Sequence, residues 1–194
     1  MSKANKTKEY IIEKTASIFN TKGYAGTSIN DLTEVTGLTK GSIYGNFKNK
    51  DDVAVEAFKY NLQVMNQLFT SEKAKEKSYR GKLLIYTKIL SDSSGSKLPI
   101  GGCPILNTAV ESDDTHPVLK ELAKRALLNW KNDFVGILNA GIQAGEFSSD
   151  LNTEQIAITI LALIEGAIMI NKLTDNNNHI CLIMQSLRDY INQI

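Results

Sequence analysis

Polar and basic side chains crowd into one short stretch, residues 36–53, which runs TGLTKGSIYGNFKNKDDV. Lys40, Ser42 and Tyr44 follow a glycine-containing turn with no acidic residue among them, and Lys48 and Lys50 come shortly after. Such side chains donate hydrogen bonds or positive charge to phosphates and base edges, and no carboxylate stands among them to repel a polyanion. The stretch therefore has the chemistry of nucleic-acid binding.

Two short helices are predicted to position these side chains. The first lies between Ser28 and Gly37, and the second is capped by Thr39 and ends near Phe47. The apolar positions expected to lock the two helices together are Leu32, Leu38 and Ile43. This is helix-turn-helix spacing, in which the second helix enters the major groove of DNA. The alternative is a solvated helical hairpin in an ordinary bundle.

The charge distribution along the chain supports a polyanionic partner. The net charge of the whole chain is +1, but residues 1–50 hold eight lysines and four acids, whereas the remainder holds 14 bases and 17 acids. The first quarter is thus basic and the rest mildly acidic, which suggests that one end meets a polyanion. A net charge of +1 is low for a DNA-compacting protein.

The composition predicts an all-α protein. The 194 residues include only three prolines, 42% are hydrophobic, and no segment shows convincing strand alternation. We expect a three-helix DNA-binding domain over residues 1–49 and a larger helical domain over 50–194, with polar connections over 71–82 and 91–102. About nine helices are predicted, over residues 4–22, 28–36, 39–47, 49–71, 83–91, 104–112, 117–145, 153–173 and 179–194.

Several classes of protein are disfavoured by what the sequence lacks. Cys103 and Cys181 are too few for a disulfide scaffold, and the N-terminus has no apolar run typical of a signal peptide. No stretch reaches the roughly 18 apolar residues of a membrane helix, the closest being 156–170. His116 and His179 show no metal-ligand spacing, and neither a phosphate loop nor a Gly-x-Ser-x-Gly motif occurs. We therefore expect a soluble cytoplasmic protein that is not an enzyme and needs no metal, cofactor or membrane.

The run GYAGTSINDLTEVTGLTKGSIYGNFKNKDDV, residues 23–53, resembles the DNA-binding pattern of the TetR family of bacterial transcriptional regulators. The resemblance covers roughly residues 8–56. It differs from the usual pattern at Thr33 and Thr36, where alanine is common, and at Asn46, where histidine often precedes the phenylalanine. The matching positions are Gly23, Tyr24, Thr27, Gly37, Gly41, Tyr44, Phe47 and Lys50.

The resemblance implies a division of roles within the motif. Tyr44 and Lys50, with Thr27 or Ser28, would position the protein on phosphates, and Gly41 would permit close approach of the backbone. The candidates for contacts with base edges are Lys40, Ser42 and Thr39. Asn46 is a further possible phosphate or base contact, and Phe47 is expected in the core.

The same resemblance implies that residues from about 50 onward bind a ligand and form a homodimer. The segments 153–173 and 179–194 are apolar enough to form a four-helix interface with a second copy, or else they only pack internally. A two-fold dimer would place two recognition helices roughly 34 Å apart on a palindromic operator in double-stranded DNA.

The small-molecule effector site is poorly specified by the sequence. Glu165 lies inside an apolar helix, so it faces a ligand pocket, pairs with a Lys or Arg, or lies at the dimer edge. Further candidates share a place on the central helices, where they line a cavity or form plain core: Tyr86, Asn107, Trp130, Phe134 and Met169.

Cys103 has two alternative interpretations. It precedes Pro104, which suits the first turn of a helix, so its thiol would sit at a helix N-terminus, where the thiolate is favoured. It is then a sensor of oxidants or electrophiles, or a small buried residue beside a Gly-rich loop. The leading prediction is a repressor released from its operator by an effector. A thiol-based regulator using Cys103 and an activator are the alternatives.

Overall fold

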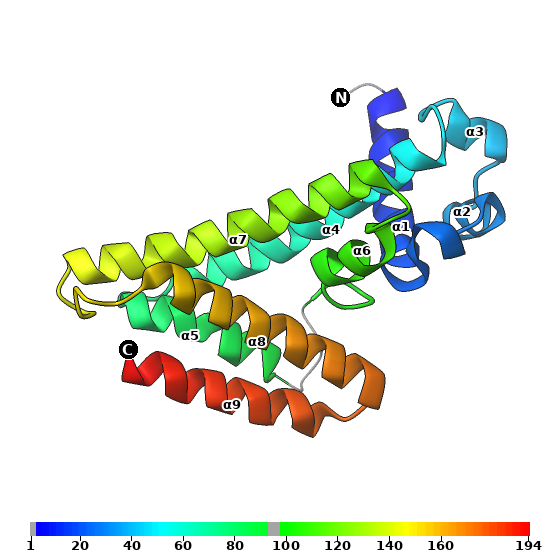
Figure 1. Ribbon diagram of the computed structural model, residues 1–194. Helices are drawn as coiled ribbons and strands as arrows, with labels where there is room; N and C mark the ends of the chain where they lie inside the picture. The colour runs from blue at the N-terminus through cyan, green and yellow to red at the C-terminus, as the bar shows by residue number, and fades with distance from the viewer. Residues whose placement is uncertain (1–2, 93–97) are drawn as a thin grey trace. The chain divides into compact units, whose positions relative to one another are not determined.

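The structure, a computed structural model, describes residues 3–92 and 98–194. Over these residues the chain forms nine α-helices and no strand, which confirms the all-α prediction (Figure 1). The helices are α1 (Lys3–Gly26), α2 (Ile29–Thr36), α3 (Lys40–Tyr44), α4 (Lys50–Lys73), α5 (Tyr79–Leu90), α6 (Pro104–Ser112), α7 (Pro117–Gln143), α8 (Thr153–Thr174) and α9 (Asn177–Gln193).

The chain divides into two compact units. The first unit comprises Met1–Met65 and Leu98–Lys124, and the second comprises Asn66–Lys97 and Arg125–Ile194. Helices α4 and α7 contribute residues to both. The division into a DNA-binding domain over 1–49 and a ligand-binding domain over 50–194 stays a prediction about function.

The core of the first unit joins α1, α2, α3 and the start of α4. Leu32 and Ile43 are completely buried, Phe47 is buried, and Leu38 packs partly buried against them. Burying a side chain such as Leu32 contributes about 1.5–3 kcal/mol relative to leaving it exposed. The predicted inward positions of the helix-turn-helix are therefore confirmed.

The predicted end of the first helix at Gly23 is confirmed, whereas the predicted start of the fifth helix is wrong. The backbone at Gly23 is not helical (φ 74°, ψ 179°), so the first helix breaks there and a further short turn runs to Gly26. Helix α5 begins at Tyr79 instead of residue 83, so the connection predicted over 71–82 shrinks to the few residues between Lys73 and Tyr79. In both places a distant carboxylate accepts the N–H groups of a new turn, which no local pattern reveals.

The start of α5 shows this long-range capping. Ser78 accepts a hydrogen bond from the N–H of Gly81, as an N-cap should. Glu146, which follows α7 in the chain, accepts hydrogen bonds from the N–H groups of Tyr79 and Arg80 over 2.8 and 2.7 Å.

The loop predicted over 91–102 includes residues 93–97, which lie outside the described residues.

The second unit is built around α8, which packs against α9, and α5, which also packs against α9. Among the described residues, α8 is the one helix long and apolar enough to cross a membrane by length and composition. A core helix of a soluble protein passes the same test, and buried side chains of α8 such as Ile160 and Ile164 are completely covered within this chain.

Candidate nucleic-acid interface

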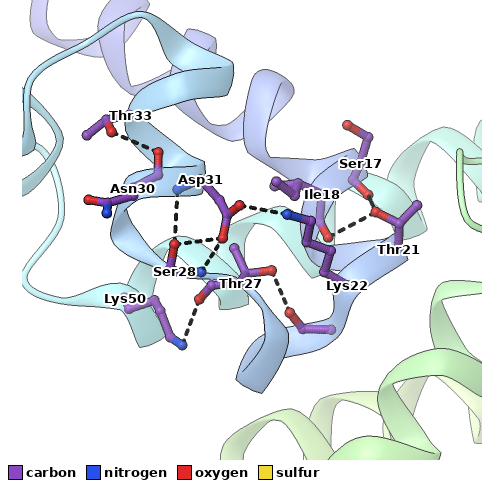
Figure 2. Close-up of polar contacts among 11 residues, drawn as sticks. Ser17, Ile18, Thr21, Lys22, Thr27, Ser28, Asn30, Asp31, Thr33 and Lys50 are labelled. Carbon is purple, nitrogen blue, oxygen red and sulfur yellow. Dashed lines mark hydrogen bonds and ion pairs between the residues drawn. The ribbon is translucent and has the colours of Figure 1, made fainter.

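A reciprocal capping box fixes the start of α2 (Figure 2). The N–H of Asp31 donates to Ser28 Oγ over 3.1 Å, and the N–H of Ser28 donates to Asp31 Oδ2 over 2.7 Å. Lys22 Nζ donates to Asp31 Oδ1 over 2.7 Å. The hydrogen bond from Lys22, followed by those from Ser28, holds the pKa of Asp31 well below its usual range. Ser28 is exposed, so its hydroxyl lies at the surface while it caps the helix.

Substituting Asp31→Asn should lower the melting temperature near neutral pH. Because the folded-state pKa is depressed, the ionised carboxylate stabilises the fold above about pH 4, the value of an unfolded Asp, and this contribution is lost as the pH falls further. The difference in melting temperature between wild type and variant should therefore shrink between about pH 4 and pH 2. Glu34→Gln, which removes an exposed acid from the same helix, is the control for the loss of one negative charge. A difference that is constant with pH would contradict this role for Asp31.

The short helix α3 presents its first turn to solvent. Thr39 is its N-cap and accepts the N–H of Ser42 over 3.2 Å. Thr39, Lys40 and Gly41 are exposed, and the remaining candidates on this segment, Ser42, Tyr44 and Asn46, are half-buried. The Lys40 ammonium lies 6.0 Å from the centre of the Tyr44 ring. The Asn46 amide donates to the Ser42 carbonyl over 2.9 Å, which engages part of its hydrogen-bonding capacity internally.

Thr27 and Lys50 face inward more than the sequence predicts. The Thr27 side chain is completely buried, and its hydroxyl donates to the Gly23 carbonyl over 2.6 Å. Lys50 Nζ donates to the carbonyls of Tyr24 and Thr27 over 2.8 and 3.0 Å (Figure 2 shows the bond to Thr27). A buried hydroxyl cannot reach a phosphate from this position. Both side chains hold the segment before α2 in place, and the phosphate contact predicted for Lys50 stays a prediction.

Tyr24 is the centre of a network that the sequence pattern did not reveal. Its hydroxyl donates to Asp51 Oδ1, and the Lys50 ammonium lies 4.1 Å from the centre of its ring. The His116 ring meets its edge at 4.6 Å, and His116 Nε2 lies 3.9 Å from Asp51 Oδ1. The hydrogen bond to Asp51, with burial next, raises the pKa of Tyr24 to about 12. Tyr24 thus stays protonated and links α1 to the starts of α4 and α7.

Helix α6 is tied to the end of α1 by two further side chains. Glu111 Oε2 accepts the N–H of Tyr24 over 2.7 Å, and Oε1 accepts the N–H of Ala25 over 2.8 Å. Asn107 Nδ2 donates to the backbone carbonyl of Asn20 over 3.0 Å. Glu111 and Asn20 are more than 80 residues from these partners in the chain, and no local motif marks them. Any movement of α6 within the first unit must strain these bonds.

The predicted aromatic ligand candidates gather in the second unit. Phe69 stacks on Tyr86 at 4.4 Å between ring centres, and Trp130 and Phe134 meet Tyr86 edge-on at 6.0 and 4.7 Å. Tyr86, Trp130 and Phe134 are all buried. The Tyr86 hydroxyl donates to Asp133 Oδ2 over 3.1 Å, and burial, followed by the charge of Asp133, raises the pKa of Tyr86 well above its usual range.

The other ligand candidates lie elsewhere. Cys103 and Asn107 belong to the first unit, where Cys103 is the N-cap of α6 as expected and is 1% exposed. Glu165 is half-buried on α8, with its Oε2 atom inside the protein, and Met169 is 45% exposed on the same helix. Within the second unit the structure therefore brings together three of the seven candidates, Tyr86, Trp130 and Phe134.

Comparisons with known proteins agree with this architecture. The family model for bacterial regulatory proteins of the tetR family matches residues 11–57, and the model for the tetracyclin repressor-like C-terminal domain matches residues 83–187. A TetR-family transcriptional regulator from Cytophaga hutchinsonii is 47% identical, with a TM-score of 0.96, and the alignment covers 100% of this chain and 97% of that one.

Two more distant relatives extend the comparison. The repressor DhaR of Mycobacterium sp. (strain GP1) is 24% identical over 171 residues, which cover 87% of this chain and 84% of DhaR. CifR, a TetR-family regulator solved as a cysteine mutant with 26-base-pair operator DNA, shares the fold with a TM-score of 0.81 and 17% identity, over 93% of this chain and 94% of CifR. This chain belongs to the TetR family of bacterial transcriptional regulators, in which a DNA-binding helix-turn-helix domain is joined to a helical ligand-binding domain.

Proposed function

We propose that the protein is a ligand-responsive repressor, which binds a palindromic operator as a homodimer and is released by a small-molecule effector. The observation that carries this proposal is the first turn of α3. Thr39, Lys40 and Gly41 are exposed there without a carboxylate among them, on a helix whose other side is locked by the buried Ile43. A rigid scaffold presenting donors in this way suits entry into the major groove. DhaR, a relative over most of its length, is a repressor, which favours repression over activation.

The exposed apolar side chains of α8 and α9 favour a homodimer as the working form. Ile158 on α8 is 49% exposed and Leu182 on α9 is 58% exposed, and Met169 and Leu173 on α8 are also exposed. Several large apolar side chains exposed on two helices that pack together suit coverage by a partner, and a second copy of the same chain satisfies a two-fold symmetric interface. On this proposal Met169 belongs to the interface rather than to a ligand pocket.

The dimer proposal predicts that Ile158→Glu and Leu182→Glu, made together, convert the protein to a monomer at micromolar concentration. Burying unpaired carboxylates in an apolar interface costs several kcal/mol, so the dimer dissociation constant should rise by about 100-fold or more. Sedimentation velocity measures the change. Leu128→Glu, at a comparably exposed leucine on α7, is the control and should remain dimeric. A dimer that survives the double substitution would place the interface on other helices.

The effector is proposed to act on α4 through the aromatic cluster of Phe69, Tyr86, Trp130 and Phe134. Phe69 lies on α4, the helix whose first residue is Lys50. A ligand that separates these rings therefore displaces α4, which positions the helix-turn-helix of α2 and α3. Asp133 and Asn66 border the cluster and can bind polar groups of an aromatic or amphipathic ligand. Linkage requires that effector and operator weaken each other's binding by the same factor.

Selection of bound duplexes from a random pool at about 150 mM salt tests the proposed function. A two-fold symmetric consensus supports a dimeric regulator, and its position in the source genome indicates which genes respond. Failure to enrich any sequence, with and without a metabolite extract, would contradict the proposal. Enrichment only in the presence of the extract would indicate an activator or a corepressor-dependent protein instead.

Cys103 remains the alternative sensor. Its place at the N-cap of α6 favours a thiolate, whereas its 1% exposure hinders access by a reagent, so we place the effector mechanism first. A protein that acts on chromosomal DNA works in the bacterial cytoplasm, and the apolar face of α8 is assigned to the dimer rather than to a membrane.

A further inference from the structure

The first two turns of α1 carry positive charge that the helix-turn-helix pattern does not include. Residues 3–8 hold three lysines and no acid. Lys6 and Lys8 are both exposed, whereas Ile11, one turn further on, is completely buried. The basic part of α1 therefore extends beyond the segment that packs in the core.

This part of α1 touches the chain on both sides of α3. The Lys8 ammonium lies 5.4 Å from the centre of the ring of Phe47, which follows α3. The hydroxyl of Tyr10 donates over 3.0 Å to the carbonyl of Thr36, which ends α2 just before the turn into α3. Figure 1 shows the first turns of α1 beside this segment. Lys8 thus lies beside the segment that follows α3, and Lys6 lies one helical turn before Tyr10, which contacts the segment that precedes α3.

Two acidic residues of α1 line a groove against α4. Glu9 and Glu13 line a separate groove together with Glu56 and Lys59 of α4, and neither Lys6 nor Lys8 lines it. The cation–π contact with Phe47 uses the face of the ring, orients Lys8 and needs no carboxylate partner. Lys8, oriented toward Phe47, therefore lies outside the groove that these acids line.

We propose that Lys6 and Lys8 bind backbone phosphates of the operator, beside the groove entered by α3. This inference rests on the proposed function, since it adds contacts to the same DNA complex. Lysine binds phosphate as a compact charge, so the contacts add affinity and salt dependence without discriminating between bases. Lys8 is held in place by Phe47, whereas Lys6 is free to follow the backbone from the exposed helical turn.

The test measures how operator affinity changes with salt for the full-length protein. Fluorescence anisotropy with the selected palindrome and with a random-sequence duplex, over roughly 50–400 mM salt, gives the slope of log affinity against log salt. Lys6→Ala and Lys8→Ala should each reduce the magnitude of the slope by roughly 0.9 per protomer bound, on both duplexes. Lys8→Arg should keep the wild-type slope. The matched control is Lys59→Ala, which removes an exposed lysine already paired with Glu56 at 2.8 Å and should leave the slope unchanged.

The outcomes separate this inference from the proposed function. A steep wild-type slope that is unchanged in Lys6→Ala and Lys8→Ala would overturn the inference and leave the DNA-binding proposal intact. A flat slope for the wild type would overturn both. An equal loss of slope in Lys59→Ala would also overturn the inference, because the effect would then follow net charge rather than contact. Unchanged melting temperatures of the variants exclude unfolding as the cause.

Discussion

Replacing Gly23 by alanine is expected to destabilise the protein by about 2–5 kcal/mol, measured by urea unfolding. Gly23 has φ 74° and ψ 179°, a conformation that only glycine adopts at low cost. A methyl group added there would also lie 2.4 Å from Glu111 Oε2. It would overlap with the carboxylate that accepts hydrogen bonds from the N–H groups of Tyr24 and Ala25. Backbone strain and steric overlap therefore act together at this position.

Two other glycines of the first unit separate these effects. Gly37 also has a positive φ, 65°, but an added Cβ would meet nothing within 4 Å, so Gly37→Ala should cost only the strain, about 1 kcal/mol. Gly26 has neither problem, since its nearest atom would be at 3.5 Å, and Gly26→Ala should change stability little. If Gly23→Ala destabilises the protein no more than Gly37→Ala, then the Glu111 side chain moves aside freely and does not hold the backbone of Tyr24 and Ala25 in place.

A double substitution isolates the part played by Glu111. Glu111→Ala leaves two backbone N–H groups without their partner and should itself cost about 1–3 kcal/mol. In that background Gly23→Ala should lose the steric part of its penalty and retain the strain, so the two changes should be less than additive. Additive costs would contradict a direct contact between the two residues.

The helix-turn-helix was predictable because its determinants are local. Ser28 and Thr39 cap α2 and α3, Gly37 ends α2 in the left-handed conformation, and Leu32 and Ile43 recur at helical spacing. Each of these signals lies within one or two turns of the feature it specifies. The exposed face of α3 followed from the same pattern, because the positions between the buried ones must point outward.

The polar ties around the motif were not predictable for the opposite reason. Glu111 meets Tyr24 across 87 positions of sequence, and Arg80 and Tyr79 donate to Glu146 across 66 and 67. A glutamate that caps a distant turn looks like any solvent-facing acid of a helix, since only the tertiary fold brings it to its donors. The inward ties of Thr27 and Lys50 were missed in the same way, because a polar residue in a binding motif can equally well serve the fold.

The ligand candidates show a third kind of limit. Tyr86, Trp130 and Phe134 recur at helical spacing, which is typical both of a pocket wall and of a packed core. Their ring contacts make a packed aromatic cluster, and the polar atoms at its border already have partners, as when Trp130 Nε1 donates to Asn66 Oδ1 over 3.1 Å. Which of these contacts an effector replaces depends on the chemistry of the effector, which is not encoded in the spacing of the aromatics.

Lys40 and Lys50 should respond to alanine substitution in opposite ways, although both are lysines of the same motif. Lys40 is exposed on the first turn of α3, so Lys40→Ala should leave stability within about 0.5 kcal/mol of wild type. It should change the preference at one or two operator positions by about 1–3 kcal/mol, as the loss of a base contact does. Selection from the random pool, repeated with the variant, measures the new consensus.

Lys50→Ala should instead weaken binding to all sequences alike. Its ammonium holds the carbonyls of Tyr24 and Thr27, so the substitution loosens the segment before α2 and should cost about 1–3 kcal/mol of stability. Without that restraint the helix-turn-helix is less well positioned on every operator. The consensus sequence should therefore stay the same, while the affinity for DNA falls about 10-fold or more. A consensus unchanged in Lys40→Ala would assign Lys40 to phosphate, and an altered consensus in Lys50→Ala would show that the segment it restrains takes part in base recognition.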